Sequence, residues 1–189
     1  IPVFTCKPAL DDRGEWDAHG GTGGTGYWIP PGWQHTRPDP STLDGYQPGY
    51  ALAAVMGHGL DVLDVDPRHD GHTSLAALDG AGMIPDVYAR ATTPSGGEHL
   101  LIASTGIASR DDVEPGLDVK AGHDGQGHGF VFIAPTVRAS KTTGELTPYT
   151  WTDAPDAGHI ATEAPHDDTG QALAAHVTAK RAATVPTTT

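Results

Sequence analysis

Two carboxylates stand two positions apart in the segment GLDVLDVDPRHDG, residues 59–71. Apolar and acidic residues alternate there, which predicts a strand over 60–66 that a proline and a glycine terminate. Because alternate side chains of a strand face the same way, Asp64 and Asp66 share one face and lie about 6.5–7 Å apart along it. Oxygen ligands of this kind suit a hard cation such as Mg²⁺ or Mn²⁺. Taken alone, the segment is more typical of solvated aspartates at the end of a strand.

A third carboxylate makes a metal site the better interpretation. Asp118 lies in a second predicted strand, GLDVKAG (116–122), with apolar neighbours on the opposite face and Lys120 on its own face. Two carboxylates on one strand and a third on another are the usual frame for two-metal phosphoryl or nucleotidyl transfer. The sequence therefore favours Asp64, Asp66 and Asp118 as metal ligands.

The segment TPSGGEH (93–99) offers a possible anion site. Ser95, the backbone amides of Gly96 and Gly97, and His99 can all donate hydrogen bonds to phosphate oxygens, since glycines allow close backbone approach. By itself such a segment is more often an ordinary turn between strands.

The remaining pattern predicts one compact domain over 1–152, followed by a linker with a short helix over 153–189. A glycine-rich surface loop is expected over 11–28, and the absence of an initial Met suggests a piece of a longer protein. Further strands are expected at 1–6, 86–91, 99–104, 129–135 and 146–151, and helices at 72–82 and 170–183.

Composition narrows the classes of function. The formal charge of −13 argues against strong autonomous DNA binding, because phosphates attract Lys and Arg, but it allows a site where metal ions supply positive charge. The single cysteine, Cys6, excludes an internal disulfide. No apolar run approaches the roughly 20 residues of a membrane span. A cytoplasmic location, in a bacterial host or phage-infected cell, is therefore expected.

The order of the motifs is more specific than any one of them. DVLDVD, then GGEH, then GLD resemble the three motifs of the archaeo-eukaryotic primase superfamily, and most closely the bifunctional primase/polymerase N-terminal domain of plasmid and phage replication proteins. The resemblance covers about residues 50–151 and includes TPSGGEHLLI, GFVFIAP and YTW. Asp66 stands where many relatives have Glu, and Gly97 stands where some have Ser or a basic residue.

This resemblance implies an α+β fold with an RRM-like mixed sheet core and flanking helices. It implies that Asp64, Asp66 and Asp118 hold catalytic Mg²⁺ or Mn²⁺, while other residues bind the nucleoside triphosphate. The nucleotide-binding set consists of Ser95, Gly96, Gly97, His99 and Lys120, with Arg138 and Lys141 as weaker candidates. The implied partners are a single-stranded DNA template, a primer strand, nucleoside triphosphates and a fused or associated helicase.

Two alternatives stay open. A metal-dependent nuclease or nicking replication initiator would also place acids and histidines on a sheet, although a nicking enzyme needs paired His ligands and a Tyr nucleophile that this sequence does not present in a good context. A nucleotide-sensing relative without catalysis is the other, and the three intact acids speak against it. Asp61 lies on the opposite face of its strand from Asp64, so it is expected to be dispensable for catalysis.

Overall fold

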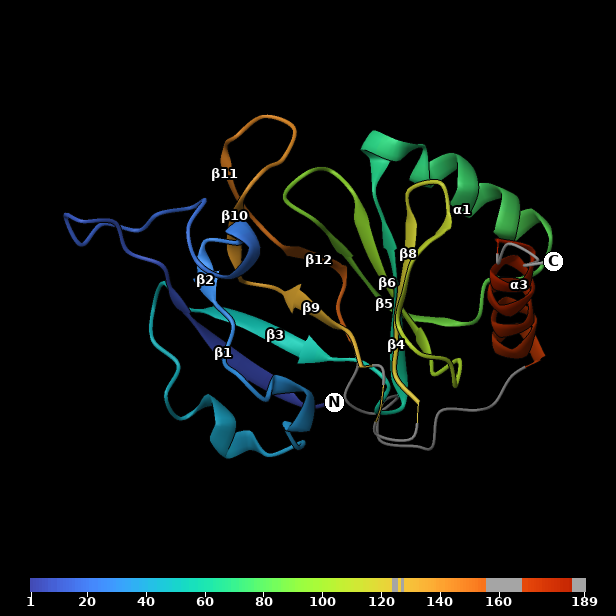
Figure 1. Ribbon diagram of the computed structural model, residues 1–189, viewed down its shortest axis with the longest axis horizontal. Helices are drawn as coiled ribbons and strands as arrows, with labels where there is room; N and C mark the ends of the chain where they lie inside the picture. Colours follow the sequence, from blue (N-terminus) through green and yellow to red (C-terminus); the bar gives the residue numbers. More distant parts are fainter. Residues whose placement is uncertain (124–125, 127, 156–167, 185–189) are drawn as a thin grey trace, which may run out of the picture.

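The computed structural model describes residues 1–123, 126, 128–155 and 168–184, which form two main β-sheets and two α-helices (Figure 1). The α+β class predicted from the sequence is confirmed. No helix among these residues is long and apolar enough to cross a membrane.

The larger sheet has six strands in the order β12-β5-β6-β4-β8-β7, with β4 near its centre. Every pairing between its described strands is antiparallel, whereas the resemblance implied a mixed sheet. Its strands are β4 (Leu60–Val65), β5 (Val87–Thr92), β6 (Glu98–Ala103), β7 (Arg110–Glu114), β8 (Leu117–Lys120) and β12 (Thr150–Asp153).

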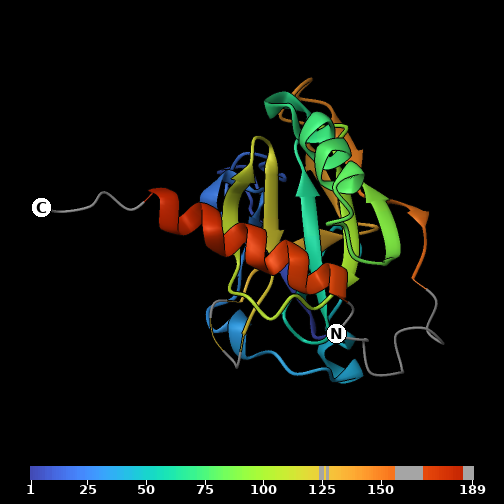
Figure 2. The same ribbon diagram turned by 90° about the vertical axis from the view of Figure 1, so that its right-hand side faces the viewer.

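Helices α1 (Gly71–Gly80) and α3 (Asp168–Thr184) cover one face of this sheet (Figure 2). Both bury apolar side chains in one core cluster with β4, β6 and β8, to which α1 contributes Leu78. Helix α1 ends where Gly82 takes a positive φ and the Met83 N–H donates to the Leu78 carbonyl, a common helix-terminating arrangement. The predicted helix over 72–82 is therefore confirmed, with slightly earlier bounds.

The C-terminal helix belongs to the same core. Leu173 and Val177, one turn apart, are buried against the sheet, and Glu114 of β7 pairs with both His176 (2.7 Å) and Lys180 (2.6 Å). The helix expected over 170–183 is present, and the hydrophobic core extends beyond residue 152, where the sequence suggested the start of a linker. Residues 156–167 and 185–189 of that expected linker lie outside the described part.

The smaller sheet has the order β2-β1-β3-β9 and carries an aromatic cluster. Trp16 packs beside Tyr27, and Trp33 packs against Phe4 and Phe130, so these two tryptophans have structural packing roles. A two-stranded sheet, β10-β11, stands beside it. The strands are β1 (Val3–Pro8), β2 (Tyr27–Trp28), β3 (Ala51–Val55), β9 (Phe130–Ile133), β10 (Val137–Ala139) and β11 (Leu146–Pro148).

Strand β4 is covered on both faces, and this determines where its acids point. Leu63 and Val65 are buried on the helical side, whereas Val62 is buried in the cluster that joins the two sheets. Asp64 follows Val62 on that second face, so it points away from the helices as the alternation predicts. Asp64 therefore lies on the face of β4 that meets the smaller sheet, next to the end of the strand and past the buried residues that join the two sheets.

Candidate active site

A cleft of about 210 Å³ lies at the end of β4, on the face opposite the helices. It contains the three acids that the sequence selected and two of the five residues predicted to bind nucleotide. Its lining includes Asp64, Asp66, Arg68, His69, Thr93, Ser95, His99, Asp112, Asp118, Arg138, Lys141 and Tyr149.

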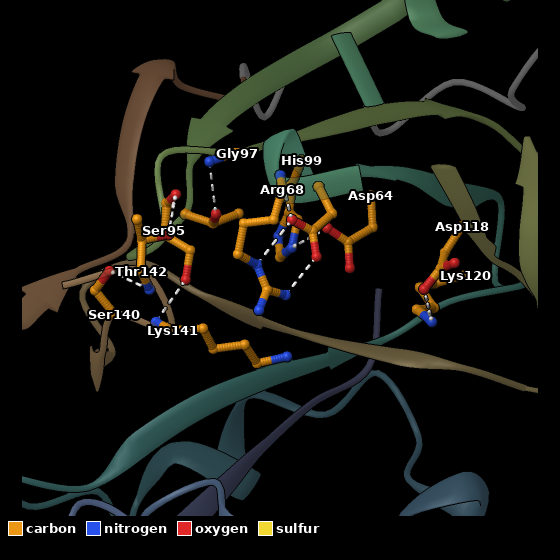
Figure 3. A network of polar contacts seen from close by, with 12 residues as sticks. Asp64, Arg68, Ser95, Gly97, His99, Asp118, Lys120, Ser140, Lys141 and Thr142 are labelled. Carbon is orange, nitrogen blue, oxygen red and sulfur yellow. Dashed lines mark hydrogen bonds and ion pairs between the residues drawn. The ribbon is translucent and has the colours of Figure 1, made fainter. Parts of the chain in front are cut away.

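Strand register explains why residues far apart in sequence meet here. Asp64 is directly opposite His99 on β6 and directly opposite Asp118 on β8. Directly paired residues on neighbouring antiparallel strands have Cβ atoms about 4.5–5.5 Å apart and point the same way. The three side chains therefore form a row across three strands, and Figure 3 shows Asp64 between the other two.

Asp64 is held in its ionised form by its neighbour. Nε2 of His99 lies 3.5 Å from Oδ1 of Asp64, and the buried His99 ring packs 5.4 Å from the ring of Tyr149. Burial acts to raise the pKa of Asp64. The hydrogen bond and charge of His99, together with the charge of Lys120, lower it by more, so the pKa lies below its ordinary value.

Asp66 begins the short 3₁₀ helix η4 (Pro67–His69) and is bound by Arg68. Its Oδ1 accepts from the backbone N–H (2.9 Å) and from Nε (3.0 Å) of Arg68, while Oδ2 accepts from Nη2. Burial acts to raise the pKa of Asp66, but these hydrogen bonds bring it below its ordinary value. Both oxygens of this carboxylate are thus engaged by one arginine.

Asp118 is enclosed by a bulge of the edge strand β7. The bulge places Asp112 at φ 52°, and its N–H donates to Oδ1 of Asp118 (2.9 Å). Lys120 donates to Oδ2 of Asp118 (2.8 Å) and also to Asp111. Burial lowers the pKa of Lys120, but the two carboxylates raise it by more. Lys120, predicted to contact phosphate or sugar, is therefore already bound between two acids.

The turn after β5 uses its glycine amides internally. Gly96 donates to the Thr93 carbonyl (3.0 Å), and Gly97 donates to Oγ1 of Thr93 (3.1 Å). A Cβ on Gly97 would lie 2.1 Å from the Val65 carbonyl oxygen, so this position packs too closely on β4 for any larger residue. These two glycines shape the turn, and among the predicted set Ser95 and His99 line the cleft.

Ser95 connects two segments that border the cleft. Its Oγ accepts from the backbone N–H of Lys141 (2.9 Å), and its carbonyl accepts from Thr142 at 3.5 Å (Figure 3). The contact fixes the turn between β10 and β11, which carries Lys141 to the cleft. The Ser95 hydroxyl hydrogen is left to donate elsewhere, because the oxygen acts as the acceptor in this bond.

Arg68, Tyr149 and Asp112 are among the cleft residues that sequence reasoning did not select. Arg68 follows the acids at i+2, and its basic type beside two carboxylates was an available signal. Tyr149 lies within the YTW segment that carried part of the resemblance, but nothing there indicated contact with His99. Asp112 gave no signal, since its role arises from a backbone bulge.

The donor chemistry of the cleft suits a divalent cation. Four carboxylates line it, and three of them are the predicted ligands Asp64, Asp66 and Asp118. The lowered pKa values of Asp64 and Asp66 keep both ionised at neutral pH. Hard oxygen donors are those preferred by Mg²⁺ and Mn²⁺. Within the described residues, however, the carboxylates do not form a ready cluster of three ligands. Instead, each of the three predicted ligands is paired with a basic side chain. His99 pairs with Asp64, Arg68 with Asp66, and Lys120 with Asp118.

Comparison with known families identifies one match. The family described as bifunctional DNA primase/polymerase, N-terminal, matches residues 13–187, which is nearly the whole chain. None of the curated proteins is significantly similar to the chain.

Proposed function

Because the chain belongs to the bifunctional DNA primase/polymerase N-terminal family, we propose that it makes or extends primers on single-stranded DNA by metal-dependent nucleotidyl transfer. The observation that carries this proposal is the row of His99, Asp64 and Asp118 across three strands, in one cleft with Asp66. It combines acids that can hold metal ions with a histidine that can donate a hydrogen bond to a phosphate, and both kinds of group suit this chemistry.

The reaction forms a bond between a primer 3′-oxygen and the α-phosphorus of a nucleoside triphosphate, breaks the bond to the β-phosphate oxygen, and releases pyrophosphate and a proton. Asp64, Asp66 and Asp118 would hold Mg²⁺ or Mn²⁺. When bound, such an ion supplies positive charge beside the hydroxyl and the phosphates, and it lowers the pKa of the hydroxyl. Asp64 stays ionised for this role because His99 lowers its pKa.

The triphosphate would lie along the other wall of the cleft. Ser95, His99 and Lys141 line that wall, and Arg138 adds a cation beside them. His99 is buried and fixed by Tyr149, so it can present one ring nitrogen to a phosphate with little loss of side-chain entropy. We keep Gly96, Gly97 and Lys120 as proposed contacts of second rank, since their polar groups already have partners.

The biological setting follows from the same proposal. The order β5-β6-β4-β8, with α1 between β4 and β5, supports the RRM-like description of the central sheet. We infer that a fused or associated helicase captures the single-stranded template, because a net charge of −13 suits this chain poorly to capture a polyanion alone. We place the activity in plasmid or phage replication, in the cytoplasm of a bacterial host or phage-infected cell.

The test is primer extension on a single-stranded template with Mn²⁺ or Mg²⁺ and labelled nucleotides. Asp64→Asn is expected to lower extension by about 10²-fold or more, because it removes an ionised ligand at the reacting phosphate. Asp61→Asn is the matched control, since Asp61 lies on the same strand but on the opposite face and is fully buried. Equal activity of both variants and the wild type would refute the assigned site.

The same assay separates the alternative functions. Shortening of the labelled strand without nucleotide addition would favour a metal-dependent nuclease, and neither product would favour a relative without catalysis. A nicking initiator needs an accessible tyrosine nucleophile. Tyr149 is the tyrosine at the cleft, but it is 6% exposed between His99 and Phe132, and burial raises its pKa. It is poorly suited to attack a phosphate.

A further inference from the structure

Arg68 occupies the carboxylate that the proposed mechanism assigns to a metal ion. Its Nε and Nη2 bind the two oxygens of Asp66 in a fork-to-fork pair, the strongest geometry available between these groups. We propose that Arg68 is an exchangeable partner of Asp66, which holds this carboxylate when no nucleotide is present and releases it to the metal ion when a triphosphate arrives. This inference rests on the proposed metal-dependent function.

Competition between Arg68 and a metal ion follows from the lone pairs of the Asp66 carboxylate, three of which already accept hydrogen bonds from Arg68. A divalent ion needs at least one oxygen of Asp66, and both accept from the guanidinium, with Oδ1 accepting from the Arg68 backbone as well. The guanidinium and the ion also repel each other as like charges. Oδ1 has no lone pair left, and an ion on the remaining lone pair of Oδ2 would lie beside the guanidinium. Metal binding at Asp66 therefore favours departure of the arginine side chain, and the cost of breaking the pair lowers the affinity for metal alone.

The exposure of the pair makes this exchange feasible. The side chains of Arg68 and Asp66 are 32% and 30% exposed, so the arginine can separate from the carboxylate without disturbing the core. The backbone N–H of Arg68 keeps its bond to Oδ1 as the cap of η4, which leaves the carboxylate oriented after the side chain has moved.

The cleft also offers the released guanidinium a new partner. Arg68 lines it together with Ser95 and Lys141, the wall proposed for the triphosphate, and Figure 3 shows its side chain lying between Asp64 and Lys141. A guanidinium binds phosphate oxygens as readily as carboxylate oxygens. A bound triphosphate would thus take over Arg68 while the metal ion takes over Asp66, which couples the two binding events positively.

Lys120 does not offer the same exchange. It pairs with Asp118, but it is also held by Asp111 and its side chain is less exposed, at 20%. Its charge stays beside the site whichever group occupies Asp118. Among the basic partners of the three acids, Arg68 is thus the one suited to switch.

The test measures Mn²⁺ binding to the full chain by electron paramagnetic resonance, with and without a non-hydrolysable nucleoside triphosphate analogue. Arg68→Ala is expected to tighten Mn²⁺ binding without the analogue by about threefold to tenfold, in the range of a partly exposed ion pair. The same variant is expected to bind the analogue more weakly, and the coupling between the two ligands should shrink. Asp66→Asn in the Arg68→Ala background should abolish the gain in Mn²⁺ affinity.

Lys141→Ala is the matched control, because it removes a positive charge from the same cleft without touching Asp66. This variant should bind the analogue more weakly while its affinity for Mn²⁺ stays nearly unchanged. If both variants bind Mn²⁺ more tightly by the same factor, the gain comes from the loss of any nearby positive charge, and the proposed exchange is refuted. Unchanged or weaker Mn²⁺ binding by Arg68→Ala also refutes it. A wild-type chain that binds no Mn²⁺ even with the analogue overturns the proposed metal-dependent function itself.

Discussion

Asp61 gives a stability prediction that also tests the strand assignment. This carboxylate is fully buried on β4, where Oδ2 accepts from the Thr105 N–H (2.6 Å) and hydroxyl (2.7 Å) while Oδ1 has no partner. Burial raises the pKa of Asp61 to about 6, against the opposing effect of the Thr105 hydrogen bonds. The folded state therefore keeps its proton up to a higher pH than the unfolded state does, and Asp61→Asn imitates the protonated form at every pH.

The magnitude follows from linkage. Below an unfolded pKa of 3.8, both states are protonated and Asp61 has no pH-dependent effect. Between that value and about 6, the folded state keeps a proton that the unfolded state has lost, so stability falls as the pH rises. Above this range, ionised Asp61 costs about 3 kcal/mol relative to a group without a shift. The variant should therefore gain on the wild type by up to that amount between pH 4 and pH 7.

The assay is urea unfolding of both proteins at pH 4, 5, 6 and 7, with Asp44→Asn as an exposed control. Only the difference between variant and wild type isolates Asp61, because Asp64, Asp66 and Glu114 have lowered pKa values and add stability as the pH rises. A difference that stays constant from pH 4 to pH 7 would refute the buried, raised-pKa assignment. Primer extension by Asp61→Asn should remain near the wild-type level.

Four further substitutions test how the site is supported. Gly97→Ala should lower the free energy of unfolding by about 3 kcal/mol, because the new Cβ would clash with the backbone of β4. In Gly96→Ala the new Cβ meets no atom, so the loss should be only about 1 kcal/mol, from strain at a positive φ. Equal melting temperatures of the two variants would contradict this. Leu173→Ala should lower the free energy of unfolding by about 2–5 kcal/mol, measured by urea unfolding, because Leu173 is fully buried. A change near zero would show that α3 does not pack in the core. Ser95→Ala should raise the nucleotide KM about fivefold at an unchanged melting temperature, because the Lys141 N–H loses its acceptor; an unchanged KM would exclude that role.

The acids could be placed from sequence because strand geometry is local. Alternation along 60–66 correctly put Asp64 opposite in direction to Leu63 and Val65, and the structure buries the latter two under the helices. What alternation cannot supply is the register between strands. That Asp64 faces His99 on one side and Asp118 on the other depends on the pairing of β4 with β6 and β8.

The segment LTPYTW shows where local patterns were insufficient. A single edge strand was expected over 146–151, but the chain divides there into β11, which pairs with β10, and β12, which joins the edge of the larger sheet. Tyr149 lies between the two strands and turns into the cleft and the aromatic cluster. This break depends on tertiary packing, because the Tyr149 ring is buried against residues from distant segments such as His99 and Phe132.

The C-terminal helix illustrates a different limit. Its composition, rich in Ala and Thr, resembles a linker, and only Leu173 and Val177 mark an apolar face. Two such residues are a weak signal in the sequence. In the structure they dock α3 on the apolar surface of the sheet that α1 leaves uncovered. Their burial against β4 and β8 could not be read from residues 153–189 alone.

Strand β4 and the residue that follows it carry acids whose pKa values are shifted in opposite directions. Asp61 has hydroxyl and amide partners and a raised pKa, whereas Asp64 and Asp66 have basic partners and lowered pKa values. The chain as a whole is strongly acidic, so neither the composition nor the acidic residues of this segment determine in which direction the pKa of each carboxyl is shifted. The direction is determined by the surroundings of each one. Burial without a basic partner raises the pKa of Asp61, whereas a histidine within β6 lowers that of Asp64 and an arginine on the following turn lowers that of Asp66.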